Sequence, residues 1–161
     1  MIVVVADTSP LNYLVQIECQ ELLPALFDRI LVPSAVIDEL AHARTPAVVR
    51  TWAGHPPEWL KIRQVHSSSD ETLAALHPGE REAIQLAQEE RADLLLMDER
   101  TGVKVARQLG LEVTGTLGVL IQGARRGLVD IDAALEHLQA TDFRCTPRLF
   151  ELLRQRAREK P

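Results

Sequence analysis

Short apolar runs alternate with helical segments along most of the chain. Runs rich in β-branched and aliphatic residues predict strands, because a strand buried on both faces needs no polar alternation. Between these runs, apolar residues recur every three or four positions, which is typical of helices with one buried face. The predicted strands span residues 2–6, 30–32, 60–65, 94–97 and 111–114; the predicted helices span 11–17, 21–27, 35–43, 80–90, 100–109, 115–126 and 131–139, and two more begin at 46 and 147.

Capping residues mark several of these helix boundaries. Ser9, followed by a proline, predicts a helix with Ser9 as its N-cap, and Asp130 and Thr146 precede two later helices in the same way. Gly110 is a suitable end for the helix before it. Strands separated by single helices predict an α/β fold with a parallel central sheet and helices on both faces.

Composition indicates an ordinary globular domain. The 161 residues suit one domain, with 46% hydrophobic and 25% charged residues. The apolar run at 2–6 is far shorter than the roughly 18 residues of a membrane-spanning helix, and no basic segment precedes it. Cys19 and Cys145 show neither metal-ligand spacing nor a disulfide framework. We therefore expect a cytoplasmic protein with no membrane segment and two buried free thiols.

Net charge is −5, which argues against a protein that coats nucleic acid by bulk attraction. The charge is uneven, however. From Arg144 onward six basic residues accompany two acidic ones, so this end carries +4 and the preceding 143 residues carry −9. The basic end either contacts phosphates or is the solvated face of a last helix.

Acidic residues follow two predicted strands at the point where each ends. Asp7 comes directly after the strand at 2–6, and Asp98 directly after the strand at 94–97. In open parallel sheets ligands bind beyond the carboxyl ends of the strands, which makes both acids candidates for one site. Each acid alone could instead cap the helix that follows it.

Two helices supply further acids. Glu80 shares the apolar face of its predicted helix, whereas Glu82 lies about 200° around that helix and points elsewhere. Asp38 and Glu39 flank the apolar stripe of the helix at 35–43 on opposite sides, and periodicity does not choose between them. Three or four carboxylates in a small volume repel one another unless a cation compensates them, and oxygen ligands suit Mg²⁺ or Mn²⁺.

A metal site of this kind activates a water molecule for attack on a phosphodiester, so no protein nucleophile is required. The scattered histidines show no zinc-ligand spacing. Arg100, Lys104 and Arg107 share one face of the helix after Asp98. They are candidates for binding a phosphate backbone, with a solvated helix face as the alternative.

Four short segments then occur in an order and at separations typical of one family. Together they resemble a PIN-domain protein, close to the VapC-type toxin ribonucleases, in a branch with Gly-Glu in the central segment. The resemblance covers about residues 1–126. Its segments are 6–11, 32–40, 79–84 and 95–102, followed by the Thr-Gly-Thr-Leu-Gly element at 114–118.

The resemblance implies a single PIN-like domain over 1–161, with a core of 1–126 and a C-terminal helical extension at 127–161. Its fold would be a three-layer α/β/α arrangement with strand order 3-2-1-4-5 and extra helices. Its activity would be that of a Mg²⁺- or Mn²⁺-dependent endoribonuclease, the toxin of a toxin–antitoxin pair, acting as a homodimer on RNA and inhibited by an antitoxin protein. A catalytically inactive PIN-like module that binds a protein or RNA is the alternative.

The resemblance also assigns roles to residues. It selects Glu39 over Asp38, and it matches Ser9 or Thr8 to a hydroxyl that orients the first acid. The catalytic and metal-binding residues that it implies are Asp7, Glu39, Glu80 and Asp98.

Overall fold

A five-stranded parallel sheet forms the centre of the molecule in the computed structural model, which describes residues 1–66 and 71–159. The strand order is β3-β2-β1-β4-β5, and every neighbouring pair is parallel. The predicted α/β fold and its strand order are therefore confirmed. The strands are β1 (Val3–Ala6), β2 (Arg29–Pro33), β3 (Leu60–Arg63), β4 (Leu94–Leu96) and β5 (Val113–Thr114).

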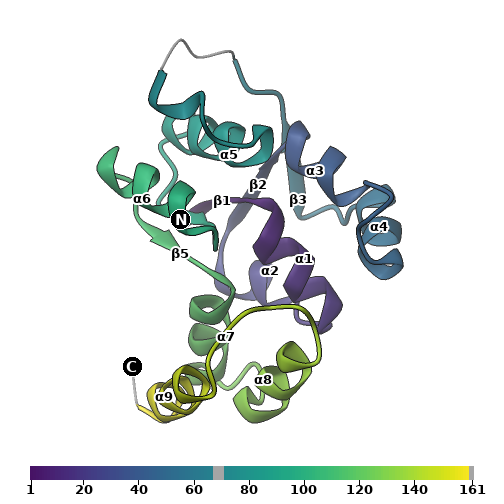
Figure 1. The fold of residues 1–161 in the computed structure, drawn as a ribbon, viewed down its shortest axis with the longest axis vertical. Helices are drawn as coiled ribbons and strands as arrows, with labels where there is room; N and C mark the ends of the chain where they lie inside the picture. The colour runs from purple at the N-terminus through teal and green to yellow at the C-terminus, as the bar shows by residue number, and fades with distance from the viewer. Residues whose placement is uncertain (67–70, 160–161) are drawn as a thin grey trace.

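Helices connect the strands and cover both faces of the sheet (Figure 1). Figure 1 shows α6 and α4 on opposite sides of β1. A short 3₁₀ turn at Glu71–Leu73 was not predicted. The helices are α1 (Thr8–Gln16), α2 (Leu22–Leu26), α3 (Ser34–Leu40), α4 (Ala47–Gly54), α5 (Pro78–Glu89), α6 (Arg100–Gln108), α7 (Thr116–Arg125), α8 (Ile131–Gln139) and α9 (Pro147–Arg158).

The central strand β1 divides the apolar interior into two layers. Val4 and Ala6 pack in the larger layer, and Val5 packs in the smaller one, because successive side chains of a strand point to opposite faces. Leu135 of α8 and Phe150 of α9 belong to the larger layer. The C-terminal helices therefore share a core with the sheet.

The first helix differs from its prediction. It begins at Thr8 with Asp7 in the N-cap position, so Ser9 lies inside the helix and is not the cap. The Asp7 carboxylate does not cap the helix either. The predicted caps of α8 and α9 are confirmed, because Asp130 and Thr146 accept backbone hydrogen bonds there.

Two bulk expectations can be compared with the structure. Both cysteines are free, as predicted, but each is partly exposed and not fully buried. In the described ranges, none of the helices has the length and apolar character needed to span a bilayer.

Candidate metal centre

The candidate site lies at the carboxyl ends of the two neighbouring strands β1 and β4. The backbone hydrogen bonds of the sheet continue beyond the strands. The Asp7 backbone N–H donates to the Leu96 carbonyl (2.9 Å), and the Met97 backbone N–H donates to the Thr114 carbonyl (2.9 Å). The backbone at Asp7 is thereby fixed, and its side chain leaves the sheet at its end. Asp98 follows Met97, two residues after β4.

Three of the four predicted acids line one cavity of about 300 Å³. Asp7, Glu39 and Glu80 reach it from the end of β1, from α3 and from the first turn of α5. Thr8, Ser9, His77 and Glu99 complete the lining. His77 and Glu99 have no assignment from the sequence, although each lies close to a predicted acid: His77 is the N-cap of α5, three residues before Glu80, and Glu99 directly follows Asp98.

Glu39 is held by hydrogen bonds from two other helices. The Thr8 hydroxyl donates to Glu39 Oε2, and the Gly79 backbone N–H donates to Oε1 at 2.9 Å. The Thr8 hydroxyl thus positions the second acid in this structure, which differs from the expectation that residue 8 or 9 orients Asp7. Asp38, the alternative that periodicity left open, is exposed.

Asp7 and Glu80 are buried acids with unused acceptor capacity. Asp7 is 2% exposed and Glu80 8% exposed, and Asp7 Oδ1 and Glu80 Oε2 have no hydrogen-bond partner. Burial, and then the carboxylates of Glu80, Glu39 and Asp98, raise the pKa of Asp7 to about 7. Burial, and then the neighbouring Glu99 carboxylate, raise the pKa of Glu80 to about 7. Both acids are therefore costly to ionise unless a positive charge is nearby.

Asp98 is placed differently from the other three acids. Its Oδ1 accepts from the Thr116 backbone N–H (2.8 Å), and its Oδ2 accepts from the Thr116 hydroxyl (2.6 Å). Burial raises the pKa of Asp98, while these two hydrogen bonds lower it. Asp98 is close enough to Asp7 for its carboxylate to help raise the pKa of Asp7. Asp98 itself, however, lines a second cavity.

Glycines provide the space that three of the acids occupy. A Cβ atom at Gly79 would lie closer than 3.0 Å to both carboxylate oxygens of Glu39. A Cβ at Gly102 would lie closer than 3.0 Å to one oxygen of Glu80 and to the Met97 sulfur, and a Cβ at Gly115 would lie closer than 3.0 Å to one oxygen of Asp98. The sequence does not reveal these close approaches, because each glycine and the acid beside it come from different structural elements.

The chemistry of these residues fits a hard divalent cation. Two buried carboxylate oxygens without partners, in a cavity with a third carboxylate, form an all-oxygen donor set. Within residues 1–66 and 71–159, no three His, Cys, Asp or Glu side chains are arranged to ligate one ion together. The oxygens that the described residues offer to a cation are therefore the two unpartnered ones of Asp7 and Glu80.

The raised pKa of Asp7 predicts a pH-dependent stability difference between the wild type and Asp7→Asn in the presence of a chelator. The carboxyl has a pKa of about 7 in the folded protein and an ordinary value of 3.8 when unfolded. Between these two pH values the folded wild type holds a proton on Asp7 that the unfolded chain has released. The free energy of unfolding of the wild type therefore falls as the pH rises through this interval. The variant should therefore gain on the wild type from about pH 4 to about pH 7. Urea unfolding of both proteins across this interval measures the difference, and a constant difference would contradict the burial of a titrating Asp7.

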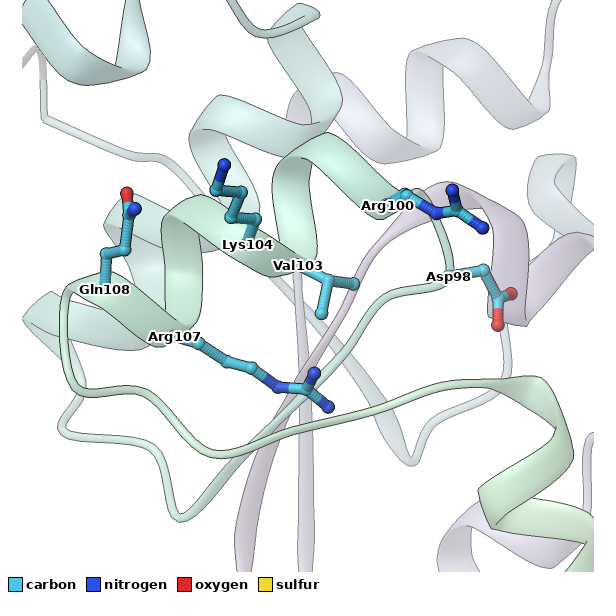
Figure 2. A pocket seen from close by; sticks show the side chains of 6 residues that line it. All are labelled: Asp98, Arg100, Val103, Lys104, Arg107 and Gln108. Carbon is cyan, nitrogen blue, oxygen red and sulfur yellow. The ribbon is translucent and has the colours of Figure 1, made fainter.

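The second cavity, of about 600 Å³, lies along α6 and is basic (Figure 2). Arg100, Lys104 and Arg107, the predicted phosphate-binding residues, line it together with Asp98, Val103 and Gln108. In Figure 2 the Arg100 guanidinium lies near the Asp98 carboxylate, whereas Lys104 and Arg107 project from α6 in opposite directions. Positive charge is thus present beside the acids.

Comparisons with known proteins agree with the fold. The sequence matches the DUF3368 family model, a PIN domain, over residues 3–159, which extends past the resemblance at 1–126. The fold is similar to that of a PilT N-terminus domain protein from the hyperthermophilic archaeon Sulfolobus solfataricus P2, with a TM-score of 0.53 and 15% sequence identity. That likeness covers 75% of this chain and 92% of the archaeal one. No curated protein matches the sequence.

Proposed function

Because this chain belongs to the PIN domain family, which has a nuclease-type fold, we propose that it is a Mg²⁺- or Mn²⁺-dependent endoribonuclease. The observation that carries the proposal is the pair of buried, unpartnered carboxylate oxygens of Asp7 and Glu80 in one cavity with Glu39. Buried polar atoms normally have a partner, so these two oxygens call for a ligand. A divalent cation is the ligand that their charge and raised pKa values favour.

Asp7 and Glu80 are the residues proposed to hold the cation. Glu39 contributes its carboxylate, whose orientation is fixed by hydrogen bonds from Thr8 and Gly79. When bound, the cation supplies Lewis-acid polarisation of a phosphoryl oxygen and acidifies the attacking water. Asp98, held by Thr116, adds negative charge at the edge of the site. No serine or cysteine nucleophile is needed for hydrolysis of this kind.

The substrate is proposed to enter along the basic cavity of α6. Arg100, Lys104 and Arg107 would bind backbone phosphates there, and Asp98 links this cavity to the buried acids. Electrostatic contacts with phosphates position a nucleic acid without selecting its sequence. A single-stranded RNA, whose backbone is accessible from several sides, suits a site at the end of a sheet.

We extend the proposal to a biological role. The motif resemblance to VapC-type ribonucleases favours a toxin that forms a homodimer and is inhibited by an antitoxin protein. The excess of basic residues from Arg144 onward offers a separate region for contact with RNA or with an acidic partner segment.

The proposal is tested by incubating purified protein with pools of single-stranded RNA and matched DNA. We expect RNA cleavage with Mn²⁺ or Mg²⁺ and none with a chelator. The same titration should raise the melting temperature, because an ion that binds only the folded state stabilises it. Absence of both cleavage and metal-dependent stabilisation would leave the inactive binding module as the better description.

A further inference from the structure

A third cavity, of about 340 Å³, adjoins the acid cavity. Thr8 and Glu39 line both cavities, so the two spaces share a wall. The remaining lining comes from α1, from the end of α3 and the segment that joins it to α4, and from Asp142 in the connection between α8 and α9. The cavity therefore lies on the β2–β3 side of the acids, whereas the basic cavity of α6 lies on the β4–β5 side.

The segment between α3 and α4 is fixed relative to Glu39. The Thr45 hydroxyl donates to the Glu39 carbonyl oxygen (3.1 Å), and the His42 backbone N–H donates to the same oxygen (3.2 Å). His42 Nδ1 accepts from the Arg44 backbone N–H (3.1 Å). The cavity wall and the candidate metal centre therefore form one preorganised unit.

The lining combines a cation with hydrogen-bonding and apolar groups. Arg44 is exposed, and it takes part in none of the ion pairs found among the described residues. Asn12 adds an amide and Asp142 a carboxylate, which with that of Glu39 confines a bound phosphate to the Arg44 end of the cavity; the Tyr13 hydroxyl orients Asp142 by donating to its Oδ1 (2.8 Å). Leu40 and Pro46 supply apolar surface. A nucleotide has the matching set of groups: a phosphate, a base edge with donors and acceptors, and an apolar base face.

We propose that this α3–α4 cavity binds the nucleotide next to the cleaved phosphodiester, with Arg44 on its phosphate. The inference rests on the proposed function, because it takes the cleaved bond to lie at Asp7, Glu39 and Glu80. A bound RNA strand then crosses the end of β1, from the basic cavity of α6 to the α3–α4 cavity. The cavity volume suits a single nucleotide, since small-ligand sites begin at about 300 Å³.

The test measures RNA binding by proteins that carry Asp7→Asn, so that the RNA is not cut. Arg44→Ala is compared with Arg50→Ala, a matched control that removes the same charge from the exposed face of α4 outside the cavity lining. Fluorescence anisotropy with a labelled single-stranded RNA gives the affinity at several salt concentrations. We expect Arg44→Ala to weaken binding about tenfold and to reduce the salt dependence by about 0.7 in logarithmic slope, the value for one lost phosphate contact.

Each outcome decides the inference separately from the nuclease proposal. Unchanged affinity of Arg44→Ala, equal weakening by both arginine variants, or absence of RNA binding by the parent protein would overturn the nucleotide cavity. Cleavage by the wild type combined with an unaffected Arg44→Ala variant would refute only the cavity. Arg44-dependent binding without any cleavage by the wild type would support nucleotide binding in the cavity, but it would refute the nuclease and with it the position of the cavity next to a cleaved bond.

Discussion

Replacing Asp7 by asparagine is expected to reduce metal-dependent RNA cleavage by about a thousandfold or more, which corresponds to roughly 4 kcal/mol of transition-state stabilisation. Asp7 is the most buried of the four acids, its Oδ1 has no hydrogen-bond partner, and it lines the cavity shared with Glu39 and Glu80. An amide of the same shape fills the space but supplies no charge to hold the cation. The measurement is the initial rate of oligonucleotide cleavage at saturating Mn²⁺.

The same substitution should stabilise the metal-free protein by about 1–3 kcal/mol at a pH above 7, since it removes a buried charge. Asp38→Asn is the matched control, because it removes an exposed carboxylate on α3 next to Glu39. The control should keep wild-type activity and stability. Cleavage at an undiminished rate by Asp7→Asn would show that the reaction takes place elsewhere.

Gly79→Ala is expected to lower cleavage by about a hundredfold with little loss of stability, a change of roughly 3 kcal/mol in the activation free energy. The new methyl group would occupy the position of the Glu39 carboxylate. Glu39 is partly exposed and has a flexible side chain, so it can move away without disturbing the core. Its hydrogen bond from the Gly79 N–H would be lost in that movement.

Gly54→Ala serves as the control for this prediction, since a Cβ at Gly54 meets no atom within 4 Å. Both alanine variants are examined for cleavage rate and for urea unfolding. A large loss of stability in Gly79→Ala would mean that helix α5, and not the Glu39 carboxylate, yields to the methyl group. Full activity in Gly79→Ala would show that catalysis does not depend on the position of Glu39.

Local patterns in the sequence predicted the strands of the sheet and the buried faces of its elements. Val4, Val5 and Ala6 form a continuous apolar run because both faces of β1 are covered. The burial of Glu80 follows from its phase relative to Ala83, which is also buried. Periodicity and strand-end position are local properties, so a single sequence is sufficient to read them.

The contacts that shape the site could not be read in this way. The pairing of Thr116 with Asp98 joins residues 18 positions apart, and that of Thr8 with Glu39 joins residues 31 positions apart. Neither spacing corresponds to a helix or strand period. The start of α1 at Thr8 was also missed, because the Ser-Pro signal placed the N-cap at Ser9, two residues after the observed N-cap Asp7. Tertiary packing decided these features.

The glycines beside the acids have a consequence for how relatives of this protein are sorted into active and inactive members. A homologue that keeps all four carboxylates but carries a larger residue at the position of Gly79, Gly102 or Gly115 would have its acid displaced from the site. Surveys that score only the acids would count such a protein as a working enzyme. An alignment that includes the three glycine columns would separate degenerate copies from competent ones.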